Sequence, residues 1–398
     1  MKAKMLSPSD YTMSRKTLGR LLFGFGSDYN QVYSMEMLNR DFDIHLDKEL
    51  EAFQYQVFSQ FKKLSDYPND EILSLDWLCA LLEAFVACHH DFEDFTSKHK
   101  ADFAKPPLDK LLKEFFDRIS IKGLDICNAV CDGIDKIRCS NKYLEIVLDA
   151  LNFRDKRRPM SKGQFRRAKK ALTGLSNVMT DNSKEYSGWF LSRSRRLKSF
   201  GRHSSKVKDL KRSVSWSVSN SWSASKQLQS MSHNMILPGP YEITTNRGLA
   251  NVVFTMSFVT MFVMWALVAA IPCQGRGILT NLSVPNNFLW ASPLSIIQVR
   301  IINESKKHDC KNSFGLLKEN YQMEKSVRVI TNLDESGHQF PLTEEEKEKV
   351  KLAVGELQMV NNAYEKWLFP FECQVRQVFH KIMSCRLEGL QNLCRTCS

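Results

Sequence analysis

The chain has 398 residues, of which 43% are hydrophobic and 25% charged, the composition of an ordinary globular protein, which excludes wholesale disorder. Lysine and arginine outnumber aspartate and glutamate by 56 to 44, and the resulting charge of +12 favours an anionic partner such as a lipid surface, a nucleic acid or an acidic protein. The 11 cysteines are an odd number scattered at mostly apolar positions, which indicates reduced thiols rather than a disulfide framework.

The first half of the chain predicts a helical bundle over residues 35–182, after an N-terminal extension of residues 1–34 that we expect to be disordered. Apolar residues recur at steps of three and four along three stretches, which is the spacing of one helix face. These stretches are residues 46–64, 74–95 and 108–151. Long amphipathic helices joined by short connections predict an all-α fold in which the helices pack as an antiparallel bundle.

A basic, serine-rich segment follows, and we expect residues 183–247 to be a linker because such a composition offers few groups to bury. The positive charge of the chain is concentrated around it, which makes its basic residues candidates for contact with anionic lipid. Phosphorylation of serines beside them would weaken that attraction. The candidate lipid-facing residues are Arg193, Arg195, Arg196, Lys198, Lys211 and Arg212. The candidate phosphorylation sites are Ser199, Ser213 and Ser215.

Within this segment, serines occupy every second position from Ser213 to Ser225, and Trp216 and Trp222 stand on the opposite phase. A period of two is typical of an extended strand that presents its tryptophans to a partner or to a lipid headgroup layer. The alternative is a disordered serine-rich linker in which the two tryptophans are incidental. The sequence leaves both interpretations open.

Residues 248–273 contain a very apolar segment without any Lys, Arg, Asp or Glu. Its inner window, represented by Val252, Phe258, Trp265 and Ile271, has the length that about 30 Å of hydrocarbon requires. It predicts a single membrane-spanning helix, with the N-terminal part of the chain in the cytosol. The alternative is the central helix of a cytosolic bundle, apolar on all sides because other helices surround it.

The C-terminal region, residues 274–398, predicts another helical pair. Thr343 and Glu346 form a capping-box pattern that predicts a helix start at this point. We expect this helix to end at Pro370 and a second helix to carry the apolar residues between Val375 and Leu393. The glycosylation sequon at Asn303 offers a test of the membrane span, because a spanning topology would place Asn303 in the lumen.

The patterns that suggest chemistry are all weak, and we expect no enzyme, no metal and no cofactor. His89 and His90 are adjacent, so on a helix they point about 100° apart, whereas zinc sites of the zincin type need histidines at i and i+4. Cys394 and Cys397 have the spacing of a zinc half-site without a second pair nearby, and the glycines at Gly24 and Gly26 lack the third glycine of a dinucleotide loop. The basic segment lacks any known nucleic-acid-binding pattern, so we expect no nucleic acid partner.

Several specific strings are spread along nearly the whole chain. They include LEAFQYQVFSQF at residues 50–61, LSLDWLCALLEAFVACHHDF at 73–92, QFRRAKKAL at 164–172, RSVSWSVSNSWSASKQL at 212–228 and VRQVFHKIMSCRLEG at 375–389. With these strings the chain resembles the plant BYPASS-related family, most closely its ROH-type members. The resemblance implies an all-helical, non-enzymatic protein of plant growth signalling, commonly described with one membrane span. It also implies a link to the exocyst tethering complex, and it supplies no catalytic or ligand residues.

Two hypotheses follow from these observations. In the first, the chain is an interaction protein at a cytosolic membrane face that binds an exocyst subunit and modulates secretion or growth signalling. In the second, it is a soluble cytosolic or nuclear adaptor in developmental signalling, and the apolar segment 252–271 is buried in its core. Extraction with alkaline carbonate distinguishes the two, because an integral span stays with the membrane.

Overall fold

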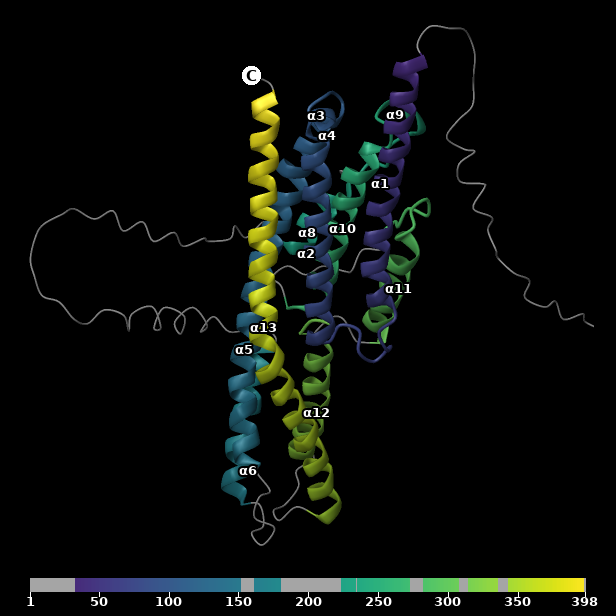
Figure 1. Ribbon diagram of the computed structural model, residues 1–398. Helices are drawn as coiled ribbons and strands as arrows, with labels where there is room; N and C mark the ends of the chain where they lie inside the picture. Colours follow the sequence, from purple (N-terminus) through teal and green to yellow (C-terminus); the bar gives the residue numbers. More distant parts are fainter. Residues whose placement is uncertain are drawn as a thin grey trace, which may run out of the picture.

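The structure, a computed structural model, describes residues 33–151, 161–179, 223–233, 235–272, 282–307, 314–335 and 343–396. The described residues form helices and contain no strand, which confirms the predicted all-α class. The longer helices run roughly along one common direction and build an elongated bundle (Figure 1).

The first two helices, α1 (Tyr33–Ser65) and α2 (Leu75–Lys98), pack against each other as the apolar stripes predict. The start of α2 is set by Ser74, whose hydroxyl accepts a hydrogen bond from the backbone N–H of Trp77 at 3.1 Å. A serine in this position satisfies one of the N–H groups that a helix leaves without an internal acceptor. The side chains of α2 that face the bundle are completely buried, Leu81 among them.

The third predicted stripe forms a continuous helical run with one irregularity. After α3 (Lys100–Phe103), it passes through α4 (Leu108–Glu114), a π-helical turn η1 (Phe115–Ser120) and α5 (Ile121–Ala150). In the π turn, the hydroxyl of Ser120 donates to the carbonyl of Phe115 at 3.2 Å. Next, α6 (Lys162–Met179) packs along α5.

Two short helices, α8 (Ala224–His233) and α9 (Pro240–Thr245), lead to α10 (Leu249–Ala270), which contains most of the apolar segment. The residue before it, Gly248, has a φ of 81°, a left-handed conformation that glycine adopts without strain. In the part of the chain that the structure describes, α10 is the one helix long and apolar enough to cross a membrane. It packs against α1, α2, α4, α5, α8 and η1, and its most apolar window is wholly buried among them.

Three polar side chains of α10 form hydrogen bonds inside the protein, whereas the buried side-chain oxygen of Asn251 has no hydrogen-bond partner among the described residues. The hydroxyl of Thr255 accepts a hydrogen bond from the side-chain amide of Gln54 in α1 at 3.0 Å, and the indole N–H of Trp290 donates to the same Gln54 at 2.7 Å. Ser257 and Thr260 donate to carbonyls one turn back in their own helix, at 2.7 and 2.8 Å. These bonds compensate for the loss of water at groups that are buried.

The last turn of α10 is joined to the chain that follows it. The carbonyls of Ala269 and Ala270 accept hydrogen bonds from the backbone N–H groups of Leu316 and Leu317, at 3.0 and 3.1 Å. This close approach requires a glycine at position 315. Gly315 has a φ of 89°, and a Cβ atom at this position would clash, since it would lie 2.1 Å from the Ala270 carbonyl oxygen. The segment after α10 therefore returns to the end of that helix.

Three helices complete the bundle: α11 (Ala291–Lys307), α12 (Lys318–Glu335) and α13 (Glu344–Thr396). The predicted capping box is confirmed, because the N–H of Glu346 donates to the Thr343 hydroxyl at 3.3 Å and the Glu346 carboxylate accepts from the Thr343 N–H at 2.8 Å. Helix α11 packs on α1, whereas α13 packs on α2, α5 and α12.

The predicted helix end at Pro370 is wrong, and so is the helical pair expected around it. Instead, α13 is one helix of 53 residues with Pro370 inside it, and it changes direction part-way along its length (Figure 1). Proline lacks an N–H and normally bends or breaks a helix. Here Leu368 and Phe371 are both buried against the bundle, while Pro370 lies on the exposed side. Packing of the inner face therefore carries the helix through the proline.

Candidate interaction surface

The candidate membrane-span residues of the apolar segment lie inside the bundle. Val252, Trp265 and Ile271 are fully buried, and Phe258 is 1% exposed and stacks on the ring of Trp290 with 5.2 Å between centroids. The candidate lipid-facing residues Arg193, Arg195, Arg196, Lys198, Lys211 and Arg212 lie outside the described residues. The candidate phosphorylation sites Ser199, Ser213 and Ser215 also lie outside them.

The two adjacent histidines of α2 point apart, as their spacing predicts. His89 is buried with its ring against Phe85, 4.6 Å between centroids, and neither ring nitrogen has a hydrogen-bond partner. Burial, assisted by the charge of Lys381, lowers the pKa of His89 to about 3, so the ring stays neutral. His90 is exposed and lies 3.6 Å from a carboxylate oxygen of Asp94. Among the described residues no group of three or more potential ligands gathers as a metal site would require.

A buried acid joins the C-terminal half to the start of α2. Glu319 of α12 accepts a hydrogen bond from the backbone N–H of Leu75 at 3.1 Å, and burial raises the pKa of Glu319 to about 7. The next residue, Asn320, accepts a hydrogen bond from the hydroxyl of the buried Tyr364 at 2.7 Å. A carboxyl with a raised pKa can signal a catalytic site. Here it caps a helix in the interior, and that contact gives it a structural role.

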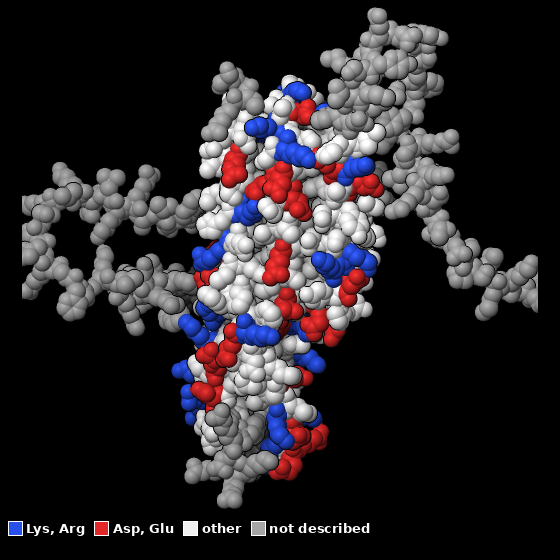
Figure 2. Space-filling model, in the orientation of Figure 1, with Lys and Arg blue, Asp and Glu red and all other residues white. Residues whose placement is uncertain are grey.

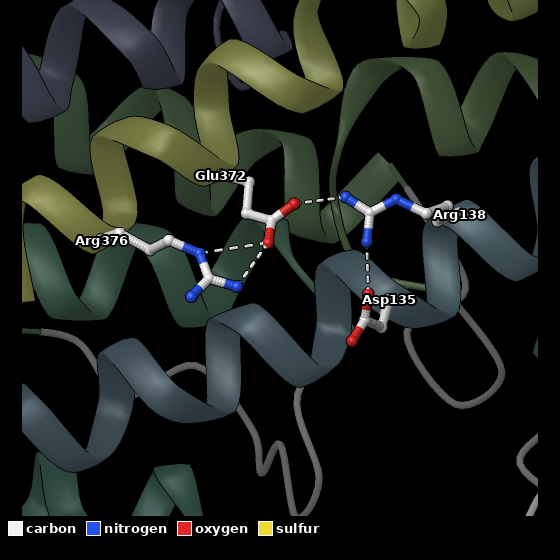
Figure 3. A network of polar contacts seen from close by, with 4 residues as sticks. All are labelled: Asp135, Arg138, Glu372 and Arg376. Carbon is white, nitrogen blue, oxygen red and sulfur yellow. Dashed lines mark hydrogen bonds and ion pairs between the residues drawn. The ribbon is translucent and has the colours of Figure 1, made fainter. Parts of the chain in front are cut away.

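Helix α13 is fastened to α5 by a charged network (Figure 3). The guanidinium of Arg138 on α5 bonds both Asp135 on its own helix and Glu372 on α13. The same Glu372 carboxylate accepts from Arg376 one turn later, at 2.7 and 3.2 Å. Burial is the largest single contribution to the pKa of the Glu372 carboxyl and raises it. The charges and hydrogen bonds of Arg376 and Arg138 together outweigh burial, so the pKa is lowered.

Further polar contacts hold α13 on α2 and η1. Lys381 pairs with Glu93 of α2, and the side-chain amide of Gln374 donates to Glu83 at 2.8 Å. Arg386 donates to the backbone carbonyl of Phe116 in η1 at 3.0 Å. With Arg138 these contacts fix the rotation of α13 about its axis, and this rotation determines which side chains face outward.

The outward face of α13 carries large apolar side chains. Phe369 is 69% exposed, Met383 44% and Leu387 57%, and earlier in the helix Leu352 and Met359 are each 65% exposed. From Phe369 onward the outward positions follow steps of four and three, the heptad spacing of a helix that packs on another helix. These positions are Phe369, Cys373, Arg376, His380, Met383 and Leu387. We refer to them as the outer stripe.

On the face of the molecule where α13 lies, acidic and basic side chains are interspersed with uncharged surface (Figure 2). Single exposed apolar residues are normal on protein surfaces, whereas a row at helical spacing is typical of an interaction site. The outer stripe was missed from sequence because a helix break at Pro370 was expected, which divides the row. Counting the heptad from Cys373 backward across the proline would have revealed it.

A second surface lies at the other end of the bundle from α4, between α6 and α12 (Figure 1). The side chains of the two helices enclose a groove of about 360 Å³. On α6 every lysine and arginine is exposed, and this helix contains no acidic residue. Arg328 on α12 pairs with Glu324 across one turn of its own helix.

The described residues thus form an all-α helical bundle with two candidate interaction surfaces. The family model described as ROH1-like matches residues 22–393, and the chain belongs to this family. The protein ROH1D of Arabidopsis thaliana is 43% identical over 358 residues, which cover 87% of this chain and 89% of ROH1D. The protein ROH1A of the same plant is 34% identical over 383 residues, which cover 87% of this chain and 90% of ROH1A. No solved structure matches the chain.

Proposed function

We propose that this ROH-type protein is a non-enzymatic adaptor that binds a helical partner through the outer stripe of α13. The observation that carries the proposal is the exposure of Phe369, Met383 and Leu387 on a helix whose rotation is held by ion pairs to α2 and α5. Rigid presentation lowers the entropy lost when a partner binds. An amphipathic helix recognises such a row through anchors at i, i+3, i+4 and i+7.

The proposal includes α10 as the central helix of a soluble bundle, which favours the second of the two hypotheses about this segment. If α10 crossed a membrane, the bilayer would separate the helices before it from those after it. The packing supports the opposite arrangement, since Arg300 of α11 donates to the carbonyls of Ser65 and Tyr67 at 3.0 and 2.8 Å. Lys318 likewise donates its backbone N–H to Leu73 at 3.0 Å.

We further propose an exocyst subunit as the helical partner, with a role in secretion or growth signalling. This part rests on the resemblance to BYPASS-related proteins of the ROH type. Contact with an anionic membrane through the residues between 183 and 247 stays a prediction, and it would make the association with membrane peripheral and sensitive to salt.

Co-precipitation of purified exocyst subunits with the full chain tests the proposal. We expect the double variant Met383→Glu with Leu387→Glu to lose at least about ten-fold in affinity, because it places two charges in an interface that must shed water. Both side chains are exposed, so the far-ultraviolet circular dichroism and the melting temperature should not change.

The matched control is Met383→Leu with Leu387→Met, which keeps both positions apolar and should bind like the parent protein. Binding that survives the charged variant unchanged would show that the partner uses another face. Failure of the parent chain to bind any exocyst subunit would remove the exocyst from the proposal.

A further inference from the structure

The groove between α6 and α12 lies on different helices from the outer stripe, and nothing assigned to the protein so far uses it. Its floor is apolar, made by Phe165, Ala168 and Leu172 of α6 and by Val327 and Ile330 of α12. A volume of about 360 Å³ is within the range of sites that hold several side chains of a bound molecule. An apolar floor without charge favours an occupant with apolar side chains.

The charged side chains that α6 contributes near the groove are all positive. Helix α6 carries five exposed cations and contains no acidic residue. The cations are Lys162, Arg166, Arg167, Lys169 and Lys170. Of these cations Lys169 lines the groove, as do Glu324 and Arg328 of α12, while the other four lie on α6 outside the lining. Figure 2 shows Lys and Arg side chains along this edge of the molecule, at the lower left of the view, with Asp and Glu side chains beside them. An occupant beside α6 would therefore meet a positive field.

The hydroxyl groups of the rim are already engaged. Thr173 donates to the carbonyl of Lys169 at 3.0 Å, and Thr331 donates to the carbonyl of Val327 at 2.9 Å. These two protons serve their own helices, and Ser176, Asn177 and Asn332 add further polar side chains to the lining. On α12 the charge of Arg328 is balanced by Glu324, so the net positive field comes from α6.

We propose that this groove binds an acidic amphipathic helix of a partner protein, with apolar side chains on the floor and carboxylates beside the cations of α6. The mode is that of a helix laid in a groove, in which the apolar anchors supply affinity and the charges select the partner. A bilayer surface is flat and would contact the outer side of α6 without filling the floor. A nucleic acid would favour aromatic side chains for base stacking, and Phe165 is the sole aromatic residue among those that line the groove.

The inference is independent of the partner proposed for α13, and its test leaves the outer stripe untouched. The probe is a fluorescein-labelled synthetic peptide with leucines at i, i+3, i+4 and i+7 and glutamates at the flanking positions. We expect a saturable rise in anisotropy with the full chain. The same peptide with lysines in place of the glutamates should not bind.

Two variants address the groove separately by charge and by volume. Arg166→Glu with Lys170→Glu reverses the charge of two exposed side chains. It should lower the affinity for the peptide about ten-fold or more, since each exposed charge pair contributes a few-fold to affinity and the new carboxylates repel the probe. Thr173→Trp places a ring in the groove from an exposed rim position and should block the peptide while α6 keeps all its cations.

The control for charge is Lys110→Glu with Lys113→Glu on α4, two exposed cations at the opposite end of the bundle (Figure 1). This variant changes the net charge by the same amount and should bind the peptide like the parent protein. Circular dichroism of each variant checks that the fold is intact.

The proposal would be overturned by the absence of saturable binding of the acidic peptide, by equal binding of the lysine peptide, or by binding that Thr173→Trp leaves unchanged. Vesicles of equal parts phosphatidylserine and phosphatidylcholine form the last arm. If Arg166→Glu with Lys170→Glu weakens vesicle binding but not peptide binding, the cations of α6 meet a membrane and the groove proposal is wrong.

Discussion

Helices α10 and α13 are both long, and they differ in where their apolar residues point. On α10 apolar side chains cover every side, and other helices surround the entire apolar window. On α13 one face is buried against α2, α5 and α12, while Phe369 and Leu387 point outward. Hydropathy predicts how much of a helix leaves water, but it does not distinguish lipid from protein as the surroundings.

The two helices differ in how much of their apolar surface other helices cover. Described residues cover every apolar side of α10. Among them are the rings of Phe61 and Trp290, which contact Phe262 and Phe258 of α10. No described helix covers the outward face of α13, although ion pairs hold the helix firmly in place. An apolar residue of the same type is therefore part of the core on α10 and part of the exposed surface on α13.

The largest effect is expected from removing α10 and α13 together. The sequence predicts that residues 35–180 fold as an independent bundle, because their apolar stripes could close a core. The packing leads us to expect the opposite. Val57 on α1 and Phe85 on α2 are fully buried in the whole chain, and α1 packs on α10 while α2 packs on both α10 and α13. Circular dichroism and one-dimensional NMR of a fragment of residues 35–180 show whether it folds without α10 and α13. A cooperative thermal transition would support the independent bundle.

A matched pair of substitutions compares the two helices directly. Phe262→Ala on α10 leaves a cavity beside Phe61, whose ring meets Phe262 edge-on at 6.0 Å, and should cost about 3–5 kcal/mol of unfolding free energy. Phe369→Ala on α13 removes an exposed ring and should cost less than about 0.5 kcal/mol. Urea denaturation of both proteins measures the difference. Equal and small effects would be inconsistent with α10 as a core helix.

A smaller effect concerns pH and the contact between α12 and α2. Burial, partly opposed by the Leu75 N–H and Lys318, raises the pKa of Glu319 from 4.5 to about 7. The folded protein then holds a proton between these two values that the unfolded chain has lost, so this group lowers the unfolding free energy as pH rises through that window. Glu319→Gln keeps an acceptor for the Leu75 N–H and should flatten this dependence. A parent protein and variant with parallel pH profiles between pH 5 and pH 7 would contradict the assignment.

Much of the fold can be predicted from local pattern. The helix starts at Ser74 and Thr343 follow from side chains that accept the free N–H groups of a first turn, and the structure has both contacts. The stripe positions in α2 are those that are buried, as Leu78 and Phe85 show. These features depend on residues close in sequence, so the sequence carries the information directly.

The remaining features depend on residues far apart in sequence. The expected end at Pro370 was wrong because packing of Leu368 and Phe371 on other helices outweighs the local effect of proline. The position of Gly315 against Ala270 likewise depends on a return of the chain that no local pattern encodes. The groove also required the structure, since it unites helices that are more than 100 residues apart.

The central claim is that α10 is the core of one bundle formed by helices from both halves of the chain. Alkaline carbonate extraction of membranes from plant cells that express the tagged full chain tests this claim most directly. The account predicts that the protein leaves the membrane pellet and that Asn303, exposed on α11, carries no glycan. Retention in the pellet together with a glycosidase-sensitive shift at Asn303 would contradict it and would establish α10 as a membrane span.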